Sequence, residues 1–363
     1  MNETFRNILV ISHENIGDII LSSAALKLLR HQYPEARITL LTSQVCRDIM
    51  EDGEVVNEAF WDTVPSSPVM RQLYKLRTIL RLRKGRYDAC YFLGHPKRKI
   101  VALCKYAGIP VRIVGSHTLS GKPNAGPVRF ATHTIPVTPP IFTHVADYYQ
   151  DIIHGYNQTG ERQKPFLHLK ETTAPPSELA AATPFKKIAL CFFGSRDNPH
   201  RWPIEYFNTL IARLAAQGHR LFTLVSAGDH QKALELVSRN RWPVDIHLTE
   251  TLGECADWLR YADLLISINT GQVHMAAALN VPVVSLSGRD TVSTYPYSNS
   301  GVVVSLVENC LRCPLDAPCR IREGNDTPDY VAPCIEGLTP EKVYPVIESM
   351  LAGNIPPERV LLV

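Results

Sequence analysis

One stretch, residues 267–288 (SINTGQVHMAAALNVPVVSLSG), constrains the fold more than any other part of the sequence. An apolar run of strand length, Ala262–Ile268, is followed by a polar turn, an alanine-rich helix and a second buried strand, Val283–Leu286. Strand, turn, helix and strand form a βαβ unit, whose crossover connection places both strands in a parallel sheet.

The turn in this unit, Asn269-Thr270-Gly271, has the features of an anion-binding site. The first residues of such a helix lie at the carboxyl edge of the sheet, where unpaired N–H groups and the positive end of the helix dipole suit phosphate. Gly271 lets a ligand approach the backbone, the Thr270 hydroxyl can cap the helix or donate a hydrogen bond, and His274 lies on the first turn. Taken alone, the residues fit an ordinary capped turn equally well.

Composition narrows the class of protein. The 363 residues are enough for two domains, and 45% hydrophobic with 20% charged residues is typical of globular chains. No apolar run reaches the length of a membrane span, and the N-terminal residues lack the pattern of an export signal, so we expect a cytoplasmic protein. Nine cysteines then indicate reduced thiols or a metal site, and a net charge of +3 is too small to indicate a nucleic-acid partner.

Strand-length apolar runs alternate with helical patterns in both halves of the chain, whereas residues 116–140 are expected to form a long loop. We therefore predict an α/β protein with two doubly wound, Rossmann-like domains that face each other across a cleft. The predicted division is a first domain 1–160, a linker 161–184, a second domain 185–340, and a terminal helix and tail 341–363 that packs back on the first domain.

A second polar segment, Gly194–Pro203 (GSRDNPHRWP), follows the first strand of the second half. It is either a polar loop before a helix that Trp202-Pro203 begins, or a source of positive charge for the phosphate site. A helix end contributes only about 0.3–1 kcal/mol per neighbouring charge, whereas a charge-assisted hydrogen bond contributes about 1.5–3 kcal/mol. A bound diphosphate would need both, which favours including Ser195, Arg196, His200 and Arg201.

Two aspartates follow strands and have two interpretations each. Asp18 either caps the helix 19–32 or accepts a proton in a reaction. An ordinary aspartate pKa of about 3.9 makes it a weak base at neutral pH, which suffices if the electrophile becomes cationic before the proton moves. Asp229 either caps a helix or binds a ribose diol. No Asp-x-Asp motif occurs, so we do not expect a metal clamp on the phosphates.

Two further patterns are ambiguous. Residues 69–86 mix leucines with arginines and lysines, which fits a solvated amphipathic helix or a docking face for an anionic membrane or acceptor. Four late cysteines, in the pattern C-x2-C-x5-C-x14-C, either bind zinc or iron or remain metal-free thiols; they are Cys310, Cys313, Cys319 and Cys334.

These motifs together resemble the bacterial heptosyltransferases of glycosyltransferase family nine. The residues that carry the resemblance are Gly17-Asp18, Arg201-Trp202-Pro203, Asn269-Thr270-Gly271, His274, Ala276–Leu279 and the cysteine loop. The resemblance implies a GT-B fold and an inverting transfer of heptose from ADP-heptose to the lipopolysaccharide inner core, with no cofactor needed for catalysis. It assigns the acceptor to the domain 1–160 and the nucleotide sugar to the domain 185–340. From the basic segment 69–86 we also expect peripheral contact with the inner membrane.

The resemblance assigns roles by position. Asp18 is similar to the family's catalytic base, Ser195, Thr270, Gly271 and His274 to its diphosphate contacts, and Asp229 to its ribose ligand. We place Asn15, Gly17 and His144 at the acceptor. The chain departs from the family in having Asn269 where aspartate is usual and His200 where lysine is usual, which leaves the cationic role to Arg196 or Arg201.

Three alternatives stay open: transfer of heptose to a protein by an enzyme with a cysteine-bound iron site, a sugar-nucleotide epimerase, and a non-catalytic nucleotide-sugar binder. An Asp18→Ala variant separates an enzyme from a binder, because only an enzyme has turnover to lose.

Overall fold

The computed structural model forms two compact units, Met1–His168 and Leu169–Val363. Within them the structure describes residues 4–12, 15–61, 67–94, 97–118, 122–139, 142–157, 160–169, 184–193, 202–287, 291–305, 333–358 and 360–362. Among the described helices, none combines the length and the apolar character that a membrane span requires.

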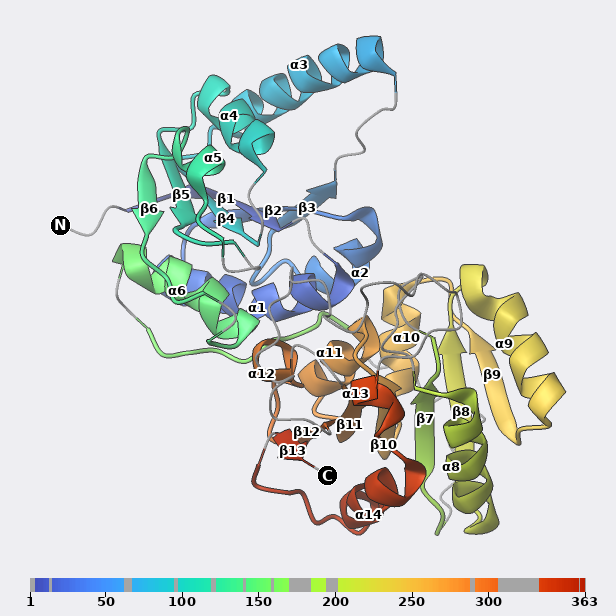
Figure 1. Ribbon diagram of the computed structural model, residues 1–363. Coiled ribbons are helices and arrows are strands. Elements are labelled where there is room, and N and C mark those ends of the chain that lie inside the picture. Colours follow the sequence, from blue (N-terminus) through green and yellow to red (C-terminus); the bar gives the residue numbers. More distant parts are fainter. Residues whose placement is uncertain are drawn as a thin grey trace. The chain divides into compact units, whose positions relative to one another are not determined.

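The first unit is built around a parallel sheet whose described strands follow the order β3-β2-β1-β4-β5-β6 (Figure 1). In chain order its elements are β1 (Asn7–Ser12), α1 (Ile16–Gln32), β2 (Arg37–Thr42), the 3-10 helix η1 (Gln44–Cys46), α2 (Arg47–Met50), β3 (Glu58–Trp61), α3 (Pro68–Gly85), β4 (Ala89–Leu93), α4 (Arg98–Tyr106), β5 (Val111–Gly115), α5 (Ala125–Val128), β6 (His133–Ile135) and α6 (Val145–Asn157). This is the doubly wound order, which confirms the predicted fold class for this half.

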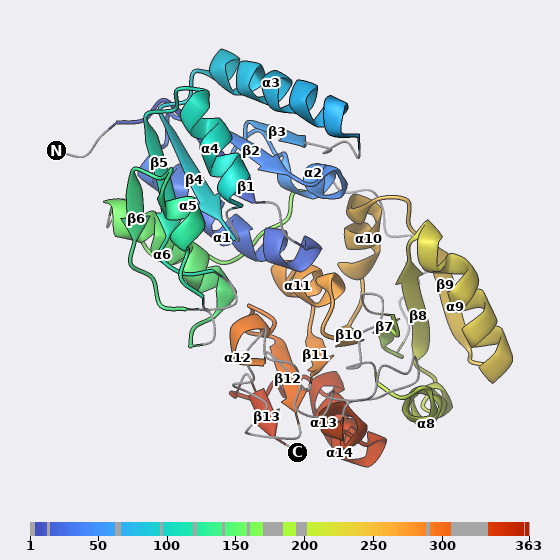
Figure 2. The same ribbon diagram turned by 45° about the horizontal axis from the view of Figure 1, so that its top comes forward.

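The helices of the first unit cover both faces of its sheet. Helices α1 and α6 pack together on one face, and α3, α4 and α5 lie on the other (Figures 1 and 2). Because both faces are covered, β1 and β4 are continuous apolar runs, as expected for a parallel sheet. The expected long loop 116–140 is wrong in part, because α5 packs on α4 and β6 pairs with β5.

The start of the predicted linker is fastened to the first unit. The backbone N–H of Phe166 donates to Ser23 Oγ of α1 at 2.8 Å, and that of His168 donates to the Ile49 carbonyl of α2 at 2.8 Å. Residues 170–183, the larger part of the predicted linker, lie outside the described residues.

The second unit contains a parallel sheet whose described strands follow the order β13-β12-β11-β10-β7-β8-β9. Its elements are β7 (Lys187–Cys191), α8 (Ile204–Ala216), β8 (Arg220–Val225), α9 (Ala227–Asn240), β9 (Val244–Leu248), α10 (Leu252–Leu259), β10 (Leu264–Ile268), α11 (Gly271–Ala278), β11 (Val283–Leu286), α12 (Thr291–Thr294), β12 (Gly301–Ser305), α13 (Pro333–Glu336), α14 (Pro340–Leu351) and β13 (Val360–Leu362). Here too the strand order reverses at the first strand of the unit, β7, as in a doubly wound sheet. The βαβ unit predicted from residues 262–286 is confirmed as β10, α11 and β11.

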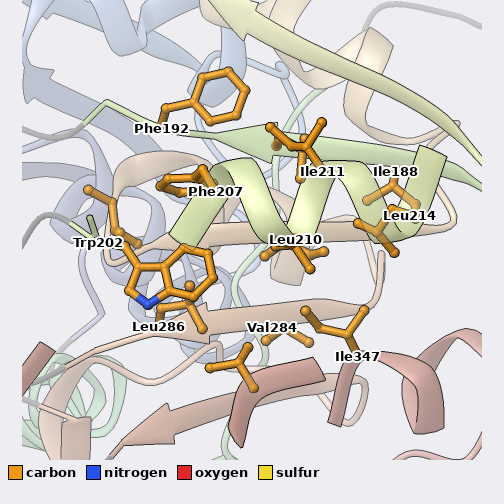
Figure 3. Close-up of a cluster of buried hydrophobic side chains, with 14 of the residues drawn as sticks. Ile188, Phe192, Trp202, Phe207, Leu210, Ile211, Leu214, Val284, Leu286 and Ile347 are labelled. Atoms are coloured by element: carbon orange, nitrogen blue, oxygen red, sulfur yellow. The ribbon is translucent and has the colours of Figure 1, made fainter. Parts of the chain in front are cut away.

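The core of the second unit lies between the sheet and helices α8 and α14. Figure 3 shows Phe207, Leu210 and Leu214 of α8 beside strand side chains such as Ile188, with Ile347 of α14 nearby. Trp202 begins this core: it is 1% exposed, and its indole N–H donates to the Leu338 carbonyl at 2.6 Å. The C-terminal residues add to the same unit, because β13 pairs with β12.

Candidate active site

The second unit has a reversal of strand order between β7 and β10, which lie side by side and are followed by helices α8 and α11. At such a point the two helices leave to opposite faces of the sheet, and the carboxyl edge between them is where doubly wound sheets bind ligands. The predicted turn at residues 269–271 stands at this edge, directly after β10.

Thr270 is the N-cap of α11 but does not cap it with its side chain. Its hydroxyl lies 3.2 Å from Ser267 Oγ and 3.8 Å from the Cys191 thiol of the adjacent strand. The first N–H groups of a helix have no intrahelical acceptor. The N-terminus of α11 therefore offers backbone donors whose capping side chain is turned to other partners.

Two amide side chains fix this helix terminus in place. Gln272 Nε2 donates to the Leu224 carbonyl near the end of β8 at 2.9 Å. Asn269 Nδ2 donates to Thr294 Oγ1 of α12 at 3.1 Å. Because both bonds tie the terminus to neighbouring elements, the N–H groups of α11 keep one orientation before any ligand arrives.

His274 lies on the first turns of α11, as predicted, and is 5% exposed. Its neighbours Val273 and Met275 are also buried, so the helix is enclosed around this position. The predicted role of His274 as a diphosphate contact stays a prediction.

Asp229 lies in the first turn of α9. The N-cap is Ser226, whose hydroxyl donates to Asp229 Oδ2 at 3.3 Å, so Asp229 is not the cap. The remaining carboxylate oxygen faces Lys232 Nζ at 3.8 Å. The carboxylate is partly exposed, and its proposed contact with a ribose stays a prediction.

The charge of Asp229 affects the Cys191 thiol at the end of β7. Burial raises the pKa of the Cys191 thiol and the Asp229 carboxylate adds to the rise, whereas hydrogen bonds with Ser267 and Thr270 lower it. The Cys191 thiol thus interacts with Ser267, Thr270 and Asp229 together.

Four residues predicted to contact the phosphates lie outside the described residues; they are Ser195, Arg196, His200 and Arg201.

In the first unit the corresponding reversal lies between β1 and β4, and α1 begins at the carboxyl end of β1. The predicted helix 19–32 starts three residues too late, because α1 begins at Ile16 and its N-cap is Asn15. Asp18 therefore sits inside the first turn and is not the cap. Its Oδ2 accepts a hydrogen bond from Asn15 Nδ2 at 3.3 Å, and Gly17 is buried beside it.

His144 is 3% exposed and holds the start of α6. Its Nδ1 accepts from the Ala146 N–H at 3.0 Å, and its carbonyl accepts from the Tyr148 N–H at 2.9 Å. These contacts give His144 a structural role, and its predicted contact with an acceptor stays a prediction.

The cysteines divide into two groups. Cys46, Cys90, Cys104, Cys191 and Cys255 are buried free thiols. Cys310, Cys313 and Cys319, with the side chain of Cys334, lie outside the described part of the chain, so the predicted zinc or iron site stays a prediction. In the part that the structure describes, no three or more His, Cys, Asp and Glu side chains gather to hold a metal ion.

Sequence reasoning missed four residues that shape the turn: Cys191, Ser267, Gln272 and Thr294. Only Ser267 and Cys191 could have been noticed in the sequence, because each places a small polar group among the apolar residues of a buried strand. Gln272 and Thr294 act through contacts with distant elements, which no local pattern reveals.

Comparison with known proteins places this chain in a family. The model of glycosyltransferase family 9 (heptosyltransferase) matches residues 76–321. Lipopolysaccharide heptosyltransferase 2 of Escherichia coli K12 is 23% identical over 95% of this chain and 98% of its own length.

Two solved structures share the fold. The E. coli ADP-heptose lipopolysaccharide heptosyltransferase II has a TM-score of 0.74 at 20% identity, covering 96% of this chain and 99% of that one. A family 9 glycosyltransferase from Veillonella parvula has a TM-score of 0.76 at 18% identity, covering 97% and 99%. These matches confirm the expected GT-B fold. The chain belongs to glycosyltransferase family 9, the heptosyltransferases, and is a heptose-transferring enzyme.

Proposed function

We propose that this enzyme transfers heptose from ADP-heptose to an acceptor in the lipopolysaccharide inner core, with inversion at the anomeric carbon. The observation that carries the donor half of this proposal is the N-terminus of α11 at the reversal of strand order, where Thr270 is the N-cap without a side-chain cap. The names of the E. coli relatives, which state ADP-heptose and lipopolysaccharide, support the choice of donor and acceptor.

The donor diphosphate binds at this helix terminus. The N–H groups of Gly271 and Gln272 and the Thr270 hydroxyl donate to phosphate oxygens, and the helix dipole stabilises their negative charge. Asn269 and His274 complete the pocket on the α11 side, while Ser195, Arg196, His200 and Arg201 supply the charge that the helix alone does not. Asp229 accepts hydrogen bonds from the ribose hydroxyls. No step requires a metal ion at the phosphates.

Asp18 is the base in this proposal. The bond between the anomeric carbon and the diphosphate oxygen breaks first, and the electron pair leaves with ADP. The acceptor oxygen then bonds to the opposite face of the cationic sugar, and its proton passes to an Asp18 carboxylate oxygen. Asn15 orients that carboxylate through the 3.3 Å hydrogen bond.

The acceptor side includes Asn15 and Gly17, which lie on the same first turn as Asp18. His144 contributes by holding α6, which packs against α1. We place the reaction in the cytoplasm at the surface of the inner membrane, because a lipid-linked acceptor must be met there. Nucleic acid has no part in it.

The test is a mass-spectrometric transfer assay with ADP-heptose and heptose-deficient lipopolysaccharide, run with Asp18→Asn. General-base catalysis is worth roughly 10²- to 10⁴-fold, so the variant should lose that much in turnover while binding ADP as the wild type does. Asp48→Asn, a partly buried carboxylate on α2 of the same unit, is the matched control and should keep full turnover.

Three results would contradict parts of this proposal. Full turnover by Asp18→Asn removes Asp18 from the chemistry. Transfer to a protein with none to lipopolysaccharide replaces the acceptor. Formation of an isomeric nucleotide sugar without transfer would indicate an epimerase.

A further inference from the structure

Helix α3 exposes an apolar stripe that the core of the first unit does not use. Val69, Leu73, Leu76 and Leu80 are 70%, 47%, 55% and 53% exposed. Their spacing of four, three and four residues puts them within an arc of roughly 60° at about 100° per residue. Single exposed leucines are common on protein surfaces, but a stripe in helical register marks an interaction site.

The opposite side of α3 is what attaches the helix to the unit. Leu82 is fully buried in a cluster with Val101 and Cys104 of α4, and Thr78 is also buried. Arg81 adds a contact across the ring of Phe60, with its guanidinium carbon 3.9 Å from the ring centre. Since these residues hold the helix, the exposed stripe contributes little to folding.

The charge of α3 indicates what the stripe meets. Residues 68–85 include no acidic residue. Their basic residues are Arg71, Lys75, Arg77, Arg81, Arg83 and Lys84. On the helical wheel Arg77 and Lys84 flank one side of the stripe and Arg83 the other. Long basic side chains beside an apolar stripe suit the headgroup region of an anionic bilayer, where the stems bury and the charges stay at phosphate level.

A second copy of this chain fits the stripe less well. A two-fold interface through α3 would place each helix against its own copy, because such interfaces are formed by the same surface twice. Arg77, Arg83 and Lys84 of one copy would then face the same three residues of the other, with no acidic residue on either helix to compensate. An anionic lipid surface has the complementary charge.

We propose that α3 docks the enzyme on an anionic membrane, with Val69, Leu73, Leu76 and Leu80 inserted below the headgroups. The helix follows β3 as α1 follows β1, so both helices begin at the carboxyl edge of the same parallel sheet (Figure 2). Asp18 lies in the first turn of α1 at this edge. Docking there brings the acceptor-side residues to the lipid surface. The role of this docking in catalysis rests on the proposed function, but binding of α3 to a membrane can be measured without any heptose transfer.

The experiment is flotation of the full chain with vesicles of phosphatidylcholine alone or with added phosphatidylglycerol. We expect flotation only with the anionic vesicles and release by high salt. Leu76→Gln with Leu80→Gln should weaken the partition coefficient at least roughly tenfold. Arg77→Gln with Lys84→Gln should weaken it roughly 30-fold.

Matched controls come from α9, which also exposes a leucine and an arginine. Leu234→Gln and Arg239→Gln should float like the wild type, and all variants should keep the wild-type urea midpoint because the changed side chains are exposed. Transfer to a water-soluble acceptor fragment should be unchanged in the α3 variants, so a failure of docking and a failure of the proposed chemistry give different results.

The inference is overturned if the wild type does not float with anionic vesicles, or if the α3 variants float as well as it does. It is also overturned if sedimentation shows a dimer that only Leu76→Gln with Leu80→Gln dissociates while flotation is unchanged. A rise in KM for the soluble fragment would instead assign the helix to the acceptor.

Discussion

Replacing Thr270 by valine tests the role of the α11 terminus, because a second N-cap threonine in the same unit provides a control. Thr251 caps α10, and its hydroxyl accepts from the Glu254 N–H at 3.1 Å. Thr270 makes no such bond, and its hydroxyl faces Ser267 Oγ at 3.2 Å. Ser267 Oγ itself donates to the Ile268 carbonyl at 2.6 Å, so it keeps a partner when the Thr270 hydroxyl is removed.

The two variants should lose similar stability and differ in ligand binding. Thr251→Val removes a cap worth about 1 kcal/mol, and Thr270→Val removes one hydroxyl pair worth about the same. Only Thr270→Val removes a donor to the diphosphate. A charge-assisted hydrogen bond contributes about 1.5–3 kcal/mol, so ADP affinity should fall roughly 10- to 150-fold.

Titration calorimetry with ADP measures the affinity, and urea unfolding measures the stability. If Thr270→Val binds ADP within about twofold of the wild type, the helix terminus is not the phosphate site. If Thr251→Val loses as much affinity as Thr270→Val, the loss reflects general destabilisation and the reasoning from the terminus fails.

Three further predictions concern stability and can be checked by urea unfolding. Leu82→Ala should lower the free energy of unfolding by roughly 2–5 kcal/mol because Leu82 is fully buried. Leu76→Ala, on the exposed face of α3, should change it by less than about 0.5 kcal/mol. Equal losses would contradict the burial of Leu82 and the exposure of Leu76. Trp202→Phe leaves the Leu338 carbonyl without its indole donor and should cost about 1–3 kcal/mol, and an unchanged midpoint would contradict that hydrogen bond. Burial, assisted by the nearby Lys186, lowers the pKa of His219, whose Nδ1 accepts from the Lys186 N–H at 3.3 Å. The pKa of His219 is thus lower in the folded protein than in the unfolded one. The stability of the fold is therefore complete, as far as His219 is concerned, above the ordinary histidine pKa of about 6.5, and it falls as the pH drops from that value through the folded pKa. His219→Gln should flatten this dependence of stability on pH.

Long patterns in the sequence predicted their elements well, and short or contact-dependent ones were missed. The run 262–286 predicted β10, α11 and β11 because burial on both faces of a parallel sheet leaves a continuous apolar signature. By contrast, β6 is three residues long and depends on pairing with β5, which no local propensity encodes. The start of α1 was placed too late because its polar first turn, which includes Asp18, resembles a loop.

The candidate site was predicted at the level of positions and not of partners. Thr270 at the N-cap of α11 followed from the strand-turn-helix pattern. Its hydrogen bond with Ser267 and its contact with Cys191 depend on a neighbouring strand and were invisible in the sequence. For α3, periodicity predicted the helix but could not say which side faces the core, because leucines occur at Leu82 on the buried face and at Leu76 on the exposed one.

The most direct test of the central claim is to incubate the wild-type enzyme with ADP-heptose and heptose-deficient lipopolysaccharide and to follow both products by mass spectrometry. We predict that each acceptor gains the mass of one heptose residue as one ADP is released. If ADP-heptose remains intact while another nucleotide sugar is consumed with the same acceptor, the assignment of the donor is contradicted.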